Sequence, residues 1–151
     1  MIIKSIDHLH LISKNIADKA TSKDCIFLIG EIGVGKTTFT RNFINYLQKK
    51  AGIKQTAVLS PTFNLLYEYD IKKFKILHYD LYRIKKKEEL TQLGIFNEND
   101  NAIKIIEWPQ LIENNITHKL ELYFSYASGE NERDINLKGF GKWKKFKLNE
   151  L

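Results

Sequence analysis

Residues 25–38, CIFLIGEIGVGKTT, decide the fold of this 151-residue chain. The stretch opens on a short continuous apolar run, residues 25–29, which is typical of a strand that is covered on both faces of a sheet. Glycines follow, and residues 38–50 then place apolar side chains at the spacing of a helix, with Gly52 just past its end. The stretch therefore predicts a strand, a glycine-rich loop and a helix.

The loop has the spacing of a phosphate-binding loop. The pattern Gly-x-x-x-x-Gly-Lys-Thr is filled, in order, by Gly30, Gly35, Lys36 and Thr37. Glycines allow positive φ angles, so backbone N–H groups can turn towards a phosphate, and the helix N-terminus favours the same anion. We therefore expect Lys36 to reach the β- and γ-phosphates of a nucleotide, and the Thr37 hydroxyl to ligate Mg²⁺.

Absent motifs narrow the class of nucleotide. A guanine-specific Asn-Lys-x-Asp box is missing, which disfavours a conventional GTPase. Only three residues of the chain are Arg, too few for the arginine lid of a metabolite kinase, although a small-molecule kinase stays an alternative. An ATP-hydrolysing switch remains. The residues expected to contact ATP or ADP are Glu31, Ile32, Gly33, Val34, Gly35, Lys36, Thr37 and Thr38.

Two acidic residues end apolar runs later in the chain. Asp80 ends the run KILHYD, and Glu107 ends the run AIKIIE. Ligands bind at the carboxyl edge of strands in open α/β sheets, and Mg²⁺ and an attacking water both need carboxylates. We therefore expect Asp80 and Glu107 to be catalytic and to share the metal site with Thr37; the pattern leaves open which of them orients the water.

The remaining pattern predicts a single α/β domain, 1–151, with a mixed central sheet flanked by helices. No repeat or linker interrupts the chain. Ser5 is placed to cap a first helix that carries Ile6, Leu9, Ile12, Ile16 and Ala20 on one face. The other expected elements are a hairpin of 65–69 with 74–79, a helix at 88–93 closed by Gly94, a strand at 102–106, a helical turn at 108–114 and a hairpin of 120–126 with 135–137. In 120–126, Glu121, Tyr123 and Ser125 are expected on an exposed face.

Composition excludes several classes of protein. One cysteine excludes a disulfide framework, and no apolar run approaches the ~20 residues that cross a bilayer, so no membrane association is expected. The first 20 residues lack the uninterrupted apolar core of a secretory signal, which predicts a cytoplasmic location. The formal charge of +6 comes mostly from lysines, which we interpret mainly as a solvated coat rather than a nucleic-acid surface.

Four blocks together resemble the TsaE family of small bacterial P-loop ATPases, which are required to make threonylcarbamoyladenosine in transfer RNA. The resemblance covers about residues 5–141. Its blocks are GEIGVGKTTFTR at 30–41, SPTFNLLYEY at 60–69, HYDLYRI at 78–84 and IIEWPQ at 105–110. The last three blocks are close to diagnostic in combination.

The resemblance implies roles for further residues. Thr62 would sense the γ-phosphate from a switch loop and belong to the catalytic set, and Arg133 would lie against the adenine. Trp108 would pack on the switch or near the nucleotide, and the alternative is a core indole. For Arg83, an arginine finger is weighed against pairing with Glu107 or Asp80, whereas His78 is expected to be a hydrogen-bonded sheet histidine.

The resemblance also implies partners. TsaB and TsaD would form the complex that modifies transfer RNA, and weak ATP hydrolysis by this chain would reset it, so contact with transfer RNA is expected to be indirect and none with DNA is expected. An alternative is direct RNA binding by the lysine- and aromatic-rich residues 138–147. The interpretation favoured for those residues is a last strand with one apolar and one solvated face.

Overall fold

Seven strands form one mixed sheet, in the order β1-β7-β6-β2-β5-β4-β3, in the computed structural model, which describes residues 1–97, 101–112 and 116–148. The inner pairs β6–β2, β2–β5 and β5–β4 are parallel. The outer pairs β3–β4, β6–β7 and β1–β7 are antiparallel. The strands are β1 (Ile2–Ile3), β2 (Cys25–Ile29), β3 (Leu66–Asp70), β4 (Lys75–Asp80), β5 (Ala102–Glu107), β6 (Leu120–Tyr126) and β7 (Arg133–Gly139). The expected mixed α/β sheet is confirmed.

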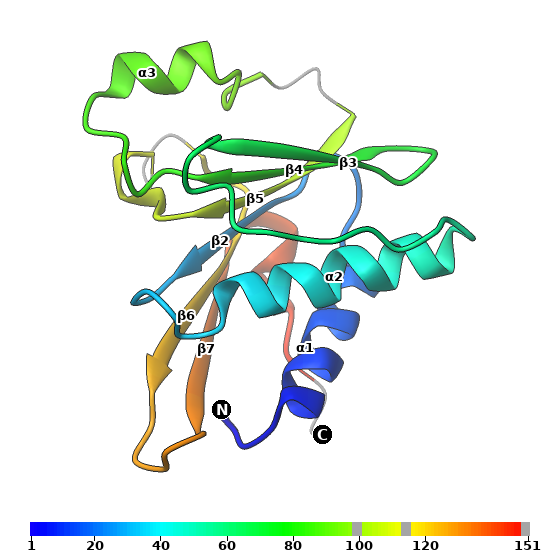
Figure 1. The fold of residues 1–151 in the computed structure, drawn as a ribbon, viewed down its shortest axis with the longest axis vertical. Coiled ribbons are helices and arrows are strands. Elements are labelled where there is room, and N and C mark those ends of the chain that lie inside the picture. The colour runs from blue at the N-terminus through cyan, green and yellow to red at the C-terminus, as the bar shows by residue number, and fades with distance from the viewer. Residues whose placement is uncertain (98–100, 113–115, 149–151) are drawn as a thin grey trace.

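Helices cover both faces of this sheet (Figure 1). The helices α1 (Ile6–Lys19) and α2 (Lys36–Lys50) pack on one face in the larger core, and α3 (Lys87–Gln92) lies over the other. Strand β2 is central and buried, since Ile26 and Leu28 point into the first core and Phe27 into the second. Its apolar run faces both ways for this reason. Two short 3₁₀ helices, η1 (Pro109–Leu111) and η2 (Gly141–Lys145), follow β5 and β7.

Helix α1 begins as its sequence predicts, with one exception. The Ser5 hydroxyl accepts a hydrogen bond from the His8 backbone N–H at 3.3 Å, which caps the helix. Leu9, Ile12 and Ile16 are buried against α2, but Ile6 is exposed, so its expected place on the buried face was wrong. Ile6 is the first residue of α1 after the cap Ser5, and its side chain faces solvent.

Both predicted hairpins form, but the exposed face expected of β6 is only partly correct. Tyr123 and Ser125 are exposed, whereas Glu121 is buried. An ion pair of 3.0 Å joins Glu121 to the buried Lys119, whose ammonium lies 4.8 Å from the Phe27 ring. The two charged side chains are thus buried as a pair. The alternation of polar and apolar residues in the sequence does not predict this burial.

The last strand expected at 138–147 was also wrong beyond Gly139. The chain turns at Gly141 into η2, which buries Trp143, and Phe146 packs against the same core. The two-faced character holds, because Lys144 and Lys145 stay exposed. A Cβ at Gly139 would lie 1.9 Å from the Trp143 carbonyl oxygen, so the close return of η2 onto β7 requires glycine there. The helical turn expected at 108–114 appears as η1, and 113–114 lie outside the described residues.

Candidate nucleotide site

The loop between β2 and α2 has the backbone that its glycines predict. Gly30, Gly33 and Gly35 have φ angles of 155°, 79° and 119°, values that residues other than glycine rarely adopt. A Cβ at Gly30 would also meet the Phe124 carbonyl oxygen at 2.6 Å. The loop therefore wraps tightly over the end of β2 and leads into the N-terminus of the 15-residue helix α2.

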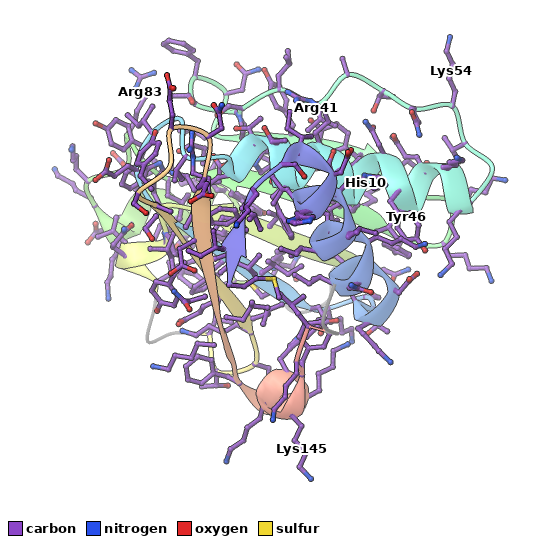
Figure 2. All side chains as sticks on the ribbon, turned by 90° about the horizontal axis from the view of Figure 1, so that it is seen from below. His10, Arg41, Tyr46, Lys54, Arg83 and Lys145 are labelled. Carbon is purple, nitrogen blue, oxygen red and sulfur yellow. The ribbon has the colours of Figure 1, made fainter. Side chains whose placement is uncertain are left out.

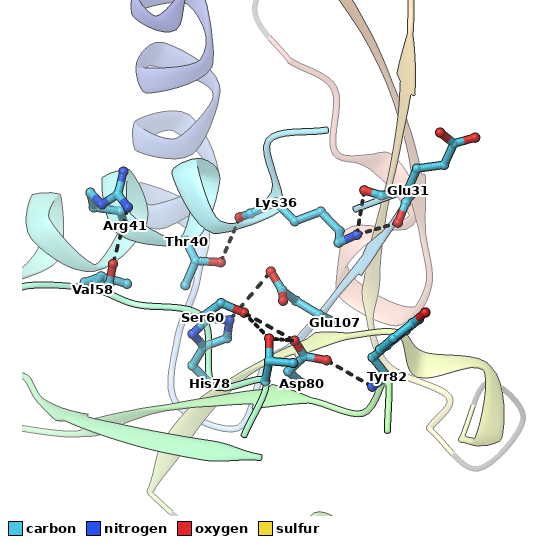
Figure 3. A network of polar contacts seen from close by, with 12 residues as sticks. Glu31, Lys36, Thr40, Arg41, Val58, Ser60, His78, Asp80, Tyr82 and Glu107 are labelled. Atoms are coloured by element: carbon cyan, nitrogen blue, oxygen red, sulfur yellow. Dashed lines mark hydrogen bonds and ion pairs between the residues drawn. The ribbon is translucent and has the colours of Figure 1, made fainter. Parts of the chain in front are cut away.

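The Lys36 side chain folds back under this loop (Figure 3). Its ammonium donates to the carbonyl oxygens of Gly30 and, at 3.0 Å, Glu31, and it lies 4.4 Å from the centre of the Trp108 ring. Burial lowers the pKa of Lys36, and the nearby carboxylates of Glu107 and Asp80 oppose that effect. The lysine is thus a buried cation that is held within the loop.

The two predicted acids are direct neighbours. Strands β4 and β5 are parallel and pair Asp80 with Glu107, so both carboxylates leave the sheet at the same edge. They are only 3% and 2% exposed. Burial of two carboxylates beside one another opposes folding, and their positive neighbour is Lys36. Such an arrangement is typical of a site that binds a cation or a developing charge.

Asp80 holds the segment that contains Ser60 and Thr62. One carboxylate oxygen accepts hydrogen bonds from Thr62 Oγ1 at 3.0 Å and Ser60 Oγ at 3.3 Å, and the other accepts the Tyr82 backbone N–H at 2.9 Å. The segment is also fixed at buried Val58, whose carbonyl oxygen accepts a 3.4 Å bond from Arg41 of α2 (Figure 3). Movement of residues 60–62 would therefore break bonds to a strand-end carboxylate.

Glu107 has the opposite environment. Its Oε1 atom is buried without a hydrogen-bond partner among the described residues. The nearest basic group is His78 Nε2, at 3.8 Å, and both ring nitrogens of the fully buried His78 also lack a partner there. The expectation that His78 is hydrogen-bonded was therefore wrong. A buried acceptor with no partner costs ~1–3 kcal/mol, so its presence calls for a function.

A cavity of about 300 Å³ joins these groups. Of the predicted site residues, the lining contains Ile32, Gly33, Gly35, Lys36, Thr37, Thr38, Thr62, Asp80 and Glu107. Glu31 and Val34 are outside the lining: Glu31 contributes its carbonyl oxygen to Lys36, and Val34 is buried beneath the loop. Most of the sequence-predicted set is thus brought together in one place.

Arg133 lies beside the loop rather than in the cavity lining. Its guanidinium is stacked over the Tyr126 ring at 4.4 Å, and the Tyr126 hydroxyl donates to the Ile32 carbonyl oxygen at 3.2 Å. The hairpin of β6 and β7 therefore touches the phosphate loop through Tyr126. Contact between Arg133 and an adenine stays a prediction.

Arg83 has neither of the two expected carboxylate partners. Its guanidinium lies 5.3 Å from the ring of Phe63, which is 83% exposed on the segment that follows Thr62. The expected pairing with Glu107 or Asp80 was wrong, because the chain turns outward after Asp80 and takes the exposed Arg83 away from the cavity.

Three further residues line the cavity, Ser60, Tyr82 and Trp108. Trp108 lies near the loop that is expected to bind the nucleotide, which was one of its predicted places, whereas Ser60 was not predicted. Trp108 adopts a left-handed φ of 57°, which aims its ring at Lys36 and at Tyr82, 4.8 Å away. A non-glycine residue in this conformation directly after a strand-end acid is the kind of strain found at functional sites. The signal available for Ser60 was the pair of hydroxyl residues on either side of Pro61.

The donor set is suited to a Mg²⁺ ion that takes further ligands from a nucleotide. The described part of the chain contains no group of three or more His, Cys, Asp and Glu side chains able to hold a metal. The cavity does offer the Thr37 hydroxyl and the unpartnered Glu107 Oε1. Mg²⁺ usually takes one or two protein oxygens and completes its shell with phosphates and water, which matches this set.

Comparison with known proteins decides the family. The model of the family described as "Threonylcarbamoyl adenosine biosynthesis protein TsaE" matches residues 3–135. The chain belongs to the TsaE family. The resemblance inferred from the four sequence blocks is thereby confirmed.

TsaE relatives match most of this chain. A tRNA threonylcarbamoyladenosine biosynthesis protein TsaE of Rickettsia conorii is 36% identical over 78% of this chain, and the match spans 65% of that relative, just under two thirds of its length. The TsaE protein of Bacillus subtilis is 32% identical over 86% of this chain and 78% of its own length. The crystal structure of YdiB from Bacillus subtilis superposes with a TM-score of 0.72 at 26% identity, covering 96% of this chain and 87% of that one. The P-loop-like α/β fold is therefore confirmed.

Hydropathy adds one observation. In the part of the chain that the structure describes, no helix combines the length and the apolar character needed to span a membrane.

Proposed function

We propose that this chain binds ATP with Mg²⁺ in the cavity at the end of β2 and hydrolyses it slowly when alone. The observation that carries the proposal is the register of β4 and β5, which sets Asp80 beside Glu107 and opposite Lys36 and Thr37. A buried cation, a hydroxyl and two carboxylates are the groups that phosphoryl transfer to water requires.

Lys36 would serve the phosphates. Its ammonium is already buried and bonded to two loop carbonyl oxygens, so exchanging those bonds for phosphate oxygens needs only a small movement of the side chain. Backbone N–H groups of the loop and the N-terminus of α2 favour the same negative charge. Burial that lowers the pKa of Lys36 makes an anionic partner more favourable still.

The two acids would divide the work according to their hydrogen bonds. Glu107 has an unpartnered oxygen and would hold Mg²⁺ together with Thr37; the ion would neutralise charge on the phosphates as the γ-phosphoryl group leaves. Both carboxylate oxygens of Asp80 accept hydrogen bonds, from Ser60 and Thr62 and from the Tyr82 N–H, so Asp80 would link hydrolysis to the 60–62 segment. Contact of Thr62 with the γ-phosphate would break its bond to Asp80 and free that carboxylate to orient water.

The chain's role lies in tRNA threonylcarbamoyladenosine biosynthesis, as its family membership indicates. Within that pathway we propose that it acts with TsaB and TsaD, and that ATP hydrolysis resets their complex between turnovers. The exposed Phe63 lies next to Thr62. A conformation of the 60–62 segment that the γ-phosphate sets would therefore change the surface that a partner contacts at Phe63.

The test is ATP hydrolysis by the purified protein with Mg²⁺, with and without purified TsaB and TsaD of the same source. We expect slow turnover alone, stimulation by the partners, and loss of the stimulated rate by at least about 100-fold in Lys36→Ala. ATP binding without any effect of the partners would contradict the proposed partnership. Phosphate transfer to an added metabolite in preference to water would favour a kinase instead.

A further inference from the structure

A second cavity, of about 420 Å³, lies beside the amino end of β2, whereas the phosphate loop follows its carboxyl end. We call it the basic groove; the described residues that line it are Lys19, Lys142, Lys145, Lys147, Trp143 and Phe146, together with one asparagine, and none of these carries a carboxylate. Figure 2 shows Lys145 projecting on the side of the molecule opposite Arg83, which follows the carboxyl end of β4. The two cavities therefore lie at opposite ends of the parallel strands.

The groove is fixed in place by one of its lysines. Lys142 Nζ lies 2.5 Å from Asp24 Oδ2 and donates to Thr21 Oγ1 at 2.8 Å and the Lys19 carbonyl oxygen at 3.3 Å, which ties η2 to the turn after α1. Lys19, Lys145 and Lys147, in contrast, form no ion pair with another described residue. Their charges are directed to solvent beside one another, an arrangement that attracts a polyanion.

A second observation is the indole of Trp143. The side chain is 2% exposed, its ring contacts Phe146 edge-on at 5.1 Å, and its N–H has no hydrogen-bond partner among the described residues. Buried indole N–H groups usually find an acceptor. The residues that line the groove thus combine ammonium groups at the surface, which suit a phosphate oxygen, with a buried indole N–H that has no acceptor among the described residues.

We propose that the basic groove binds the phosphodiester backbone of RNA. The choice of RNA among polyanions rests on the proposed function, since relatives of this chain are named for the biosynthesis of a modified transfer RNA nucleoside; direct contact would correct the expectation that transfer RNA is met only through partners. Because the Trp143 ring is buried and Phe146 is half-buried, they present no open face on which a base could stack. Binding is therefore by phosphate contacts, independent of sequence and strongly dependent on salt.

The first test measures binding of unmodified transfer RNA by fluorescence anisotropy between 50 and 200 mM KCl. Lys145→Glu/Lys147→Glu is compared with Lys54→Glu/Lys73→Glu, a control in which two exposed lysines on another part of the surface are reversed. Both variants have the same net charge, so a general effect of charge acts on both equally. We expect the groove variant to bind at least tenfold more weakly and to lower the salt slope by about two, with the control within twofold of the wild type.

The second test locates the contact with the two tryptophans of the chain, one in each cavity. In a ¹⁵N–¹H spectrum, a short RNA hairpin should shift the indole resonance of Trp143 and leave that of Trp108 in place, whereas ATP with Mg²⁺ should do the reverse. Trp108→Phe assigns the two resonances. A shift of Trp108 alone on addition of RNA would overturn the proposal.

Failure of this inference is distinguishable from failure of the ATPase proposal. Lys36→Ala should retain transfer RNA binding, and Lys145→Glu/Lys147→Glu should retain ATP hydrolysis. Equal weakening in the groove and control variants, or wild-type protein that does not bind RNA at 50 mM KCl, would overturn the RNA site. Binding to phosphatidylserine vesicles without RNA binding would overturn it too, in favour of a membrane surface.

Discussion

The two cavities, which lie at opposite ends of the parallel strands, differ in where their charged groups lie. At the carboxyl end, Lys36, Asp80 and Glu107 are buried around one cavity, and a Glu107 oxygen has no partner among the described residues. At the amino end, the aromatic ring of Trp143 is buried and the lysines around it stay mostly at the surface. The phosphate-loop cavity keeps its charges inside the fold, and the basic groove keeps most of its charges in water.

This difference separates what folding requires from what function requires. Buried charges oppose folding, and an ion pair seldom recovers the full cost of desolvation, so three of them in one cavity indicate a ligand. Exposed lysines change the free energy of folding very little, so they indicate a ligand only where several of them lie together. We expect substitutions at the first end to change activity and the apolar residue at the second end to determine stability.

The largest effect on folding is expected for Trp143→Ala. Removal of this buried ring should cost ~3–5 kcal/mol, because β7, α1 and η2 meet around it. Denaturant unfolding measures the loss. ATP hydrolysis per folded molecule should stay at the wild-type rate, and a loss of activity without a loss of stability would contradict the proposed separation of the two ends.

Asp80→Asn should reduce partner-stimulated hydrolysis by about 100-fold, the usual range for removing a group that orients or activates water. The amide retains one acceptor oxygen but loses the charge that Ser60 and Thr62 share. Limited proteolysis should also cut residues 58–64 faster. Ser60→Ala is the matched control for the loop alone, because it removes one bond to Asp80 and leaves Thr62 in place; wild-type turnover in Asp80→Asn would remove Asp80 from the mechanism.

Glu107→Gln should raise the Mg²⁺ concentration needed for half-maximal hydrolysis by about tenfold. Its melting temperature should equal or exceed that of the wild type, because the variant removes a buried charge whose Oε1 has no hydrogen-bond partner among the described residues. Mg²⁺ titration and thermal unfolding give the two readouts. A clear fall in stability would mean that Glu107 is held for structural reasons.

The smallest effect is expected on the surface, where Tyr46→Phe removes a hydrogen bond of 2.5 Å to Asp18. That bond, with Lys50, lowers the pKa of Asp18 below its ordinary value of 3.8. The ionised Asp18 therefore stabilises the folded state at pH values above 3.8, and this stabilisation is lost as the pH falls through the pKa of the folded state. Solvent screening limits the effect to about 0.2–1 kcal/mol near pH 7. Unfolding free energies of wild type and variant should converge in acid; a constant difference would exclude the Asp18 bond as its cause.

Local patterns predicted much of this molecule correctly because their causes are local. The glycine spacing at 30–35, the apolar run of β2 and the Ser5 cap depend on neighbouring residues, and each formed as expected. The acids Asp80 and Glu107 were found for the same reason, since each ends its own strand.

Long-range packing decided the rest. The burial of Glu121 depends on Lys119 and on the Phe27 ring of another strand. The unpartnered nitrogens of His78 depend on what β5 places beside β4. Strand β1 has two residues, too few for a pattern, and exists because it pairs with β7 at the other end of the chain.

The sequence by itself determined the phosphate loop, the strand-end acids and the family, because each is written in a short run of residues whose backbone geometry follows from residue type. Only the tertiary structure decided that Lys36 lies beneath Trp108, that Asp80 holds Ser60 and Thr62 while Glu107 keeps an unpartnered oxygen, and that four lysines surround Trp143. These facts depend on distances between segments that are far apart in the chain, which the register of the sheet sets and a local pattern does not contain.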